Sequence, residues 1–155
     1  MSKAVKKAKT VAATIKLVIK AGQAKPGPPV GPALGQAGLQ IMTFCKDFNA
    51  KTADIKDDAP IPVVINAYSD KTFDYVMRTP PASYFIKMAA GIDKASQRPG
   101  HQSAATISAK HVYEIAKVKQ KDLQANIPLE SLCRSIVGTC RSMGVKVIPK
   151  PEQTS

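Results

Sequence analysis

The side chains that most often carry catalysis or bind metals are few in this sequence, and their spacing defines no site. There are three cysteines, Cys45, Cys133 and Cys140, and two histidines, His101 and His111. Cys133 and Cys140 are seven residues apart, which would place them on one face of a helix, but the histidines do not complete a zinc-ligand spacing. No paired carboxylates lie in an apolar setting, and no Ser/His/Asp or Cys/His grouping is suggested. We therefore expect no enzyme activity, no metal and no cofactor.

The charge of the chain is the first indication of a partner. Lys and Arg number 23 against 11 Asp and Glu, which gives a net charge of +12. Residues 1–78 hold 12 basic and 6 acidic side chains and residues 79–155 hold 11 and 5, so each half carries +6. Both halves should attract a polyanion, with nucleic acid as the first candidate and a merely soluble basic protein as the alternative. No membrane partner is expected, because we find no basic amphipathic helix with a bulky apolar face and no bilayer-length apolar run.

Residues 21–38, AGQAKPGPPVGPALGQAG, form the most unusual segment. They look superficially like a phosphate-binding loop, but they lack the Gly-Lys-Ser/Thr ending of a P-loop and any G-x-G-x-x-G pattern. Prolines alternate with glycines, so we expect neither a helix nor a paired strand there. Such a rigid surface suits packing against a nucleobase or a protein partner, and an ordinary rigid connection is the alternative. The prolines concerned are Pro26, Pro28, Pro29 and Pro32.

Residues 128–143 are predicted to form the clearest helix, which Gly144 stops. Its apolar stripe consists of Leu129, Leu132, Cys133, Ile136, Val137, Cys140 and Met143, and its opposite face of Arg134, Ser135, Gly138, Thr139, Arg141 and Ser142. Glycine inside a helix costs about 1 kcal/mol relative to alanine, and the close approach of another backbone would compensate for it. Arg, Ser and Thr bind phosphates and 2′-hydroxyls, so RNA is one candidate. The alternative is a solvated face on which Gly138 packs against a neighbouring helix.

A basic loop is predicted at residues 92–105, where Lys94, Arg98 and His101 stand among Ser, Gln and Gly. The loop is short of apolar anchors, so we expect it to become ordered only when RNA binds. His111 is predicted to lie on a helix as a surface or packing residue.

These segments predict an α+β protein of two small domains, with a proline-rich linker, TPPAS, at residues 79–83. The N-terminal domain, 11–78, is expected to hold a three-stranded sheet with strands 11–20, 61–68 and 72–77, and a helix over 39–48 that stops at Asn49. The C-terminal domain, 84–148, is expected to be mainly helical, with helices at 82–90, 109–119 (capped by Ser108) and 128–143 and a short strand at 145–148. Residues 1–10 are a basic tail and residues 149–155 a second tail.

Several long motifs in the right order closely resemble the large-subunit ribosomal protein eleven family, whose members stand in the ribosomal GTPase-associated centre. They are KPGPPVGPALGQAG and IMTFCKDFNAKT in the N-terminal half, then IPVVI, TPPAS, AAGIDK and SIVGTCRSMG. The resemblance covers residues 11 to 148. It implies a structural constituent of the large ribosomal subunit, with large-subunit rRNA and the ribosomal stalk-base protein as partners and translational GTPases and release factors as transient ones.

The resemblance also implies which residues bind. The C-terminal domain would grip a compact fold of rRNA through its third helix and the long loop, while the mobile N-terminal domain presents the four prolines to rRNA and factors. Thiopeptide antibiotics act at the positions of Pro28 and Pro32 in this family. The implied rRNA-binding residues are Lys87, Gly91, Lys94, Ser96, Arg98, Pro99, Gly138, Thr139, Arg141, Ser142 and Met143.

Some positions depart from the family's usual pattern. Cys140 stands where alanine is usual, and Met88 where a second lysine is common, so Lys87 would act alone. Gly-His-Gln-Ser follows Pro99 in place of a basic run, which should weaken phosphate contacts there. The stretches YFIKMAAGIDK and HVYEIAKVKQKD resemble mitochondrial members, so we predict a mitochondrial ribosome in the matrix, with a bacterial or plastid-type ribosome as the alternative. Two alternative functions remain, a non-ribosomal interaction module and a thiol enzyme that uses Cys45. The helical spacing of Cys45 beside two phenylalanines favours burial of this cysteine over a role in catalysis.

Overall fold

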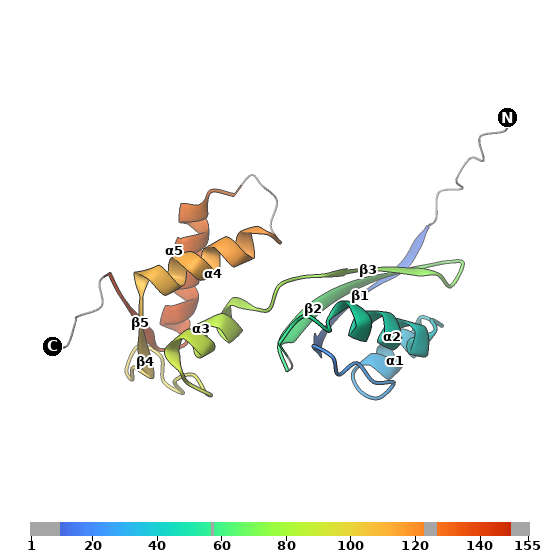
Figure 1. Ribbon diagram of the computed structural model, residues 1–155, viewed down its shortest axis with the longest axis horizontal. Helices are drawn as coiled ribbons and strands as arrows, with labels where there is room; N and C mark the ends of the chain where they lie inside the picture. The colour runs from blue at the N-terminus through green and yellow to red at the C-terminus, as the bar shows by residue number, and fades with distance from the viewer. Residues whose placement is uncertain (1–9, 57, 123–126, 150–155) are drawn as a thin grey trace. The chain divides into compact units, whose positions relative to one another are not determined.

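The computed structural model describes residues 10–56, 58–122 and 127–149 (Figure 1). The chain is α+β, as predicted, and divides into two compact units, residues 1–78 and 79–155. Most of the two predicted tails lies outside the described residues.

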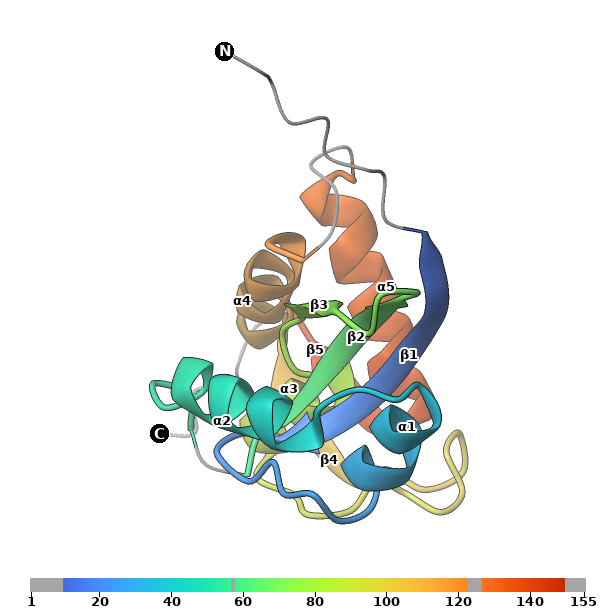
Figure 2. The same cartoon turned by 90° about the vertical axis from the view of Figure 1, so that its right-hand side faces the viewer.

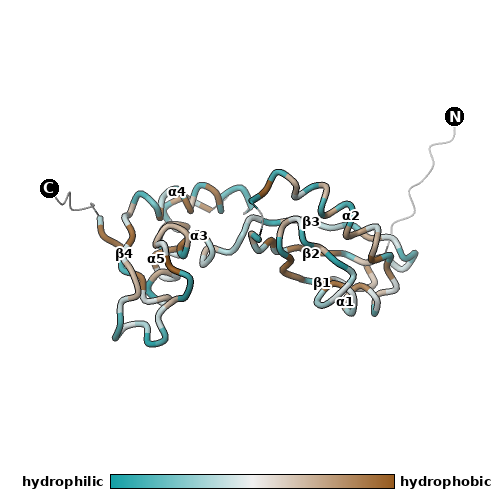
Figure 3. Tube along the Cα trace, turned by 60° about the horizontal axis from the view of Figure 1, so that its bottom comes forward, coloured by the Kyte–Doolittle hydropathy of each residue, from teal (hydrophilic) through white to brown (hydrophobic). Residues whose placement is uncertain are grey.

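The N-terminal unit is built on an antiparallel sheet with strand order β1-β2-β3. The strands β1 (Val11–Lys20), β2 (Pro60–Tyr68) and β3 (Phe73–Met77) pair in a register that joins Ile15 to Ile65 and Val64 to Val76. Burial alternates along β2, which fits a sheet with one packed face. Helices α1 (Val30–Gln36) and α2 (Ile41–Lys51) lie on that face (Figures 1 and 2). Hydrophobic residues concentrate along β1 and β2 (Figure 3).

Helix α1 corrects the prediction that no helix forms in the proline segment. Pro29 is its N-cap and Pro32 lies in its first turn, where the missing N–H would have no helical partner anyway. Val30 and Leu34, one turn apart, are both buried and hold the helix on the core. Proline spacing excludes a long helix but not a two-turn one.

The predicted end of α2 is also wrong, because the helix continues past Asn49 to Lys51. The Asn49 side chain instead holds the start of the proline segment. Its Oδ1 accepts from Ala24 N at 3.0 Å, and its Nδ2 donates to Ala24 O at 3.1 Å. Buried Thr52 adds a second tie, because its Oγ1 accepts from Gly22 N at 3.1 Å.

The described residues of the C-terminal unit form three helices and a two-stranded parallel sheet. The elements are α3 (Ala82–Ala90), β4 (Ala105–Ser108), α4 (Ala109–Gln120), α5 (Leu129–Ser142) and β5 (Val145–Ile148). The helices and β5 are as predicted, and the Ser108 hydroxyl caps α4 by accepting from Lys110 N. Strand β4 was not predicted, because its four residues show no alternation long enough to indicate a strand.

Three helices and the small sheet share one core, in which Ile86, Val112, Ile136 and Cys140 are buried. The stripe predicted on α5 is correct for Leu132, Ile136, Cys140 and Met143. It is wrong for Val137, whose side chain is 42% exposed. Hydrophobic and hydrophilic residues also alternate along α4 in Figure 3, as expected for a helix with one packed face.

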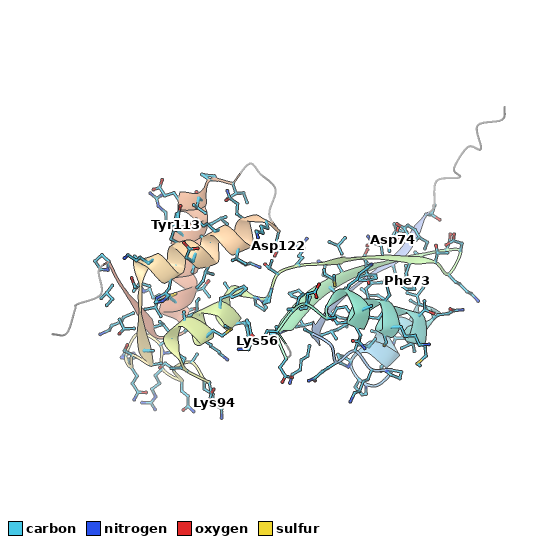
Figure 4. All side chains as sticks on the ribbon, in the orientation of Figure 1. Lys56, Phe73, Asp74, Lys94, Tyr113 and Asp122 are labelled. Atoms are coloured by element: carbon cyan, nitrogen blue, oxygen red, sulfur yellow. The ribbon has the colours of Figure 1, made fainter. Side chains whose placement is uncertain are left out.

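The first residues of the predicted linker are bound to the C-terminal unit. Asp122 Oδ2 accepts from Thr79 N at 2.7 Å and also from the Thr79 hydroxyl. Lys119 Nζ, which pairs with Asp122 at 3.3 Å, donates to Pro80 O at 3.3 Å. Figure 4 shows Asp122 at the end of α4 beside this segment. Because Ala82 already begins α3, the 79–83 segment has little free chain, and the boundary of the two units falls between Arg78 and Thr79.

Candidate RNA-binding surface

Gly138 lies on an open face of α5. Apart from its chain neighbours and the adjacent turns of helix backbone, a Cβ added there would meet no atom of the described residues within 4 Å. The alternative that Gly138 packs against a neighbouring helix is therefore wrong for the described part of the protein. Without a side chain, this turn of α5 lets a second backbone come within contact distance of the helix.

Two hydroxyls on this face have defined hydrogen bonds. Thr139 Oγ1 donates to Ser135 O at 3.1 Å, and Ser142 Oγ donates to Thr139 O at 2.8 Å. Each hydroxyl has a single proton, so both oxygens are left with free lone pairs. They can accept hydrogen bonds from a ligand, and the 2′-hydroxyl of RNA is a suitable donor.

The two arginines of the face differ in whether they form an ion pair. Arg134 pairs with Glu130 at 2.6 Å, and both side chains are highly exposed. Arg141 is exposed and has no ion pair among the residues that the structure describes. Exposed ion pairs are weak, so Arg134 can still turn to a phosphate. Arg141 has no ion pair among the described residues to break when it does so.

The long loop after α3 is tied to the C-terminal end of α5. Ser96 N donates to Met143 O at 3.0 Å, and Ala104 N donates to Gly144 O at 2.8 Å. The loop therefore has a defined path in the free chain, which corrects the expectation that it orders only on RNA. Backbone hydrogen bonds replace the apolar anchors that its sequence lacks.

The tie brings most of the predicted rRNA-binding residues to one end of the C-terminal unit. Lys94, Arg98 and Pro99 are exposed on the loop, and Figure 4 shows Lys94 projecting outward. Gly91 ends α3 in the left-handed conformation with φ +64°, and both Lys87 and Ser96 are partly exposed. Met143 is the exception. Its side chain is in the core, so only its carbonyl contributes, by anchoring the loop.

Gly144 makes the crossing of loop and helix possible. Its φ is +72°, and an added Cβ would lie 2.5 Å from the Ser96 Cβ and 3.0 Å from Gln102 O. Sequence reasoning recognised Gly144 only as a helix stop. Its positive φ and the close approach of the loop each require glycine at this position, and the second requirement depends on where the loop lies.

Gly144→Ala is expected to lower the free energy of unfolding of the C-terminal unit by about 3 kcal/mol or more, from left-handed strain and the clash together. Urea denaturation of the full chain, followed by circular dichroism, measures the change. The matched control is Gly91→Ala, with φ +64° and open space around its added Cβ among the described residues. It should lose only about 1–2 kcal/mol. Equal losses for the two variants would show that the loop does not press on Gly144.

The prolines of the N-terminal unit form a second exposed surface. Pro26, Pro28, Pro29 and Pro32 all have exposed side chains. The loop that carries them is tied to α2 through Asn49, a role that its predicted function as a helix stop did not include. A rigid, apolar and solvent-exposed surface of this kind can bind a partner with little loss of conformational entropy.

Two of the three thiols, those of Cys45 and Cys140, are buried. Burial raises the pKa of the Cys45 and Cys140 thiols, which keeps them protonated and unreactive. The described residues contain no group of three or more His, Cys, Asp or Glu side chains placed to hold a metal. Among these residues there is also no helix with the length and hydropathy that a bilayer crossing requires.

The comparisons with known proteins agree with the division into two units. The family model "Ribosomal protein L11, N-terminal domain" matches residues 15–73, and "Ribosomal protein L11, RNA binding domain" matches residues 78–147. The "Large ribosomal subunit protein uL11" of Ruegeria pomeroyi is 50% identical over 140 residues, which span 90% of this chain and 99% of that protein. The protein of the same name from Brucella anthropi is 50% identical over 141 residues, 91% of this chain and 99% of that protein.

Fold, surface and matches together define a two-domain ribosomal protein of the RNA-binding class. The chain belongs to the ribosomal protein L11 family, as its motifs predicted. Both relatives are bacterial, so the mitochondrial assignment stays a prediction.

Proposed function

We propose that this chain is a non-catalytic constituent of the large ribosomal subunit that binds the rRNA of the GTPase-associated centre through its C-terminal unit. The binding surface consists of the open face of α5 and the loop that is tied to its end. The observation that carries the proposal is the pair of backbone hydrogen bonds from Ser96 to Met143 and from Ala104 to Gly144. They hold the basic loop beside the Gly138 face before any RNA is present, so that one folded RNA can contact both.

The N-terminal unit has a different role in this proposal. Its four exposed prolines present a rigid surface to rRNA, to the ribosomal stalk-base protein, and transiently to translational GTPases and release factors. The physical support is the anchoring of this surface by Asn49 and Thr52, which reduces the entropy lost on contact. The bacterial relatives favour a ribosome of the bacterial type over the predicted mitochondrial one.

Affinity of the full chain for a folded fragment of large-subunit rRNA, measured against salt concentration, tests the proposal. The expected contacts are Lys87, Lys94, Arg98, Arg134 and Arg141. We expect a slope of log affinity against log salt that corresponds to about two to four phosphates, because shape and 2′-hydroxyl contacts carry the rest.

The same RNA kept unfolded by removal of Mg²⁺ is the control, and it should bind much more weakly. A slope typical of a protein that wraps a duplex, or equal affinity for folded and unfolded RNA, would contradict recognition by shape. Failure to co-sediment with large subunits at high salt would instead favour the non-ribosomal interaction module.

A further inference from the structure

A pocket of about 490 Å³ opens beside the Gly138 face of the C-terminal unit. Val137 and Arg141 of α5 form one wall, Lys146 and Ile148 of β5 another, and residues 100–103 of the long loop the third. Pockets that take small ligands measure roughly 300–1,000 Å³, so the space is sufficient for one nucleotide. Of the residues that line it, only Arg141 is among the charged contacts proposed above.

Two exposed side chains of the lining are apolar, in contrast to the polar Gly138 face. Val137 is 42% exposed and Ile148 is 38% exposed. Val137 lies outside the stripe that packs α5 onto the core, so packing of the helix does not require an apolar side chain at this position. A flat apolar group that covered these two side chains would remove them from water, and such burial is favourable.

The rim of the pocket is basic. Arg141 and Lys146 both line it, and neither has an ion pair among the described residues. No acidic side chain of the described chain belongs to the lining. The pocket therefore combines exposed apolar side chains with free positive charge, which matches an aromatic ring that carries an anion.

We propose that this pocket takes one unstacked nucleotide of the rRNA that the adjacent face of α5 binds. The base lies on Val137 and Ile148, and its phosphate lies between Arg141 and Lys146. The inference rests on the proposed function. RNA is favoured over a free nucleotide because Arg141 belongs both to the Gly138 face and to the pocket lining, so the pocket borders that face. Sequence-specific recognition of RNA commonly uses bases that leave the stack.

The third wall gives the pocket a means to distinguish bases. His101, Gln102 and Ser103 line it, and their side chains are exposed. The amide and hydroxyl can donate to or accept from the edge of a base, and imidazole can stack on its face. The Gly-His-Gln-Ser sequence has few positive charges to contact phosphates, but its side chains can form hydrogen bonds with the edge of a base.

Val137→Glu is the direct test, made in the full chain with the folded rRNA fragment. It places a carboxylate where the base would lie, and we expect affinity to fall about tenfold to a hundredfold, the range for the loss of one stacked base. The charge-matched control is Ser131→Glu, at an exposed position of the same helix outside the pocket lining. It should change affinity by less than about threefold, the effect of one exposed charge. Val137→Thr, nearly isosteric, gives a second variant if the carboxylate disturbs the fold.

Abasic RNA identifies the base. Each unpaired nucleotide of the fragment is replaced in turn by an abasic one, and affinity is measured for the native chain and for Val137→Glu. We expect one position at which the abasic change weakens RNA binding by the native chain about tenfold but leaves binding by the variant unaffected.

Two outcomes would overturn the pocket assignment and leave the proposed function standing. They are effects of the abasic change and of Val137→Glu that add at every position, and equal affinities of Val137→Glu and Ser131→Glu. A variant that binds RNA normally but is lost from purified subunits would assign the pocket to a protein, which also overturns it. If the native chain does not bind the folded fragment, the proposed function itself fails.

Discussion

Gly138→Val is expected to reduce affinity for the folded rRNA fragment by about a hundredfold, equivalent to roughly 2.8 kcal/mol, while the C-terminal unit stays folded. An added Cβ at Gly138 meets no described atom outside the adjacent helix backbone within 4 Å, so the protein itself has room for a side chain that starts there. Helix propensity does not oppose the change either, because glycine is the poorer helix former. Filter binding and thermal unfolding of one preparation give the two numbers.

Gly138→Ala is a second test of the same proposal, because it should raise the stability of the helix and lower the affinity for RNA. The helix should gain about 1 kcal/mol in stability. The RNA affinity of this variant should lie between the affinity of the native chain and that of the valine variant. The matched control is Ser131→Val, which puts the same side chain at an exposed position two turns earlier on α5. If the control weakens binding as much as Gly138→Val, the close approach at Gly138 is not the cause. If Gly138→Val unfolds the unit, the glycine serves internal packing and the RNA argument fails.

Replacing Pro28 and Pro32 together by alanine is expected to lower kcat/KM for factor-dependent GTP turnover about fivefold to twentyfold, with unchanged protein content in purified subunits. Each proline restricts the flexible state by about 0.4–1 kcal/mol, and that entropy returns to a surface that must be ordered on contact. The two prolines lie in the N-terminal unit, whereas the proposed rRNA-binding surface lies in the other unit, so binding to rRNA should persist. Quantitative mass spectrometry and GTPase assays on the same subunits measure both effects.

Asn49→Ala is the companion variant, because it keeps all four prolines and removes the two hydrogen bonds to Ala24. A similar fall in turnover would show that rigidity of the loop matters. Normal turnover with Asn49→Ala, beside a fall with the proline pair, would show that the prolines touch the factor directly. Loss of the proline variant from the subunit would make the loop an assembly anchor, in contradiction to the factor-facing role.

Local pattern was sufficient for most elements of this protein. The alternation at residues 61–68, the stripe at 128–143 and Ser108 before an apolar helix each depend on neighbours in sequence, so β2, α5 and the cap of α4 were predicted within about two residues. The exceptions are short. Helix α1 has only seven residues and β4 only four, too few for a period to be distinguished from chance. The net charge and long motifs placed the chain in a class of RNA-binding proteins without any coordinates.

The sequence by itself therefore determined the α+β class, the two domains and the family, and it also supplied the prediction that α5 binds RNA. Tertiary structure decided which groups are available to a ligand. Parallel pairing of β4 with β5 and the ties of Ser96 and Ala104 to Met143 and Gly144 join segments about 40 residues apart. They bury Met143, leave Val137 in an open pocket and require glycine at 144. Exposure and close approach depend on contacts between distant segments, and neither composition nor periodicity specifies those contacts.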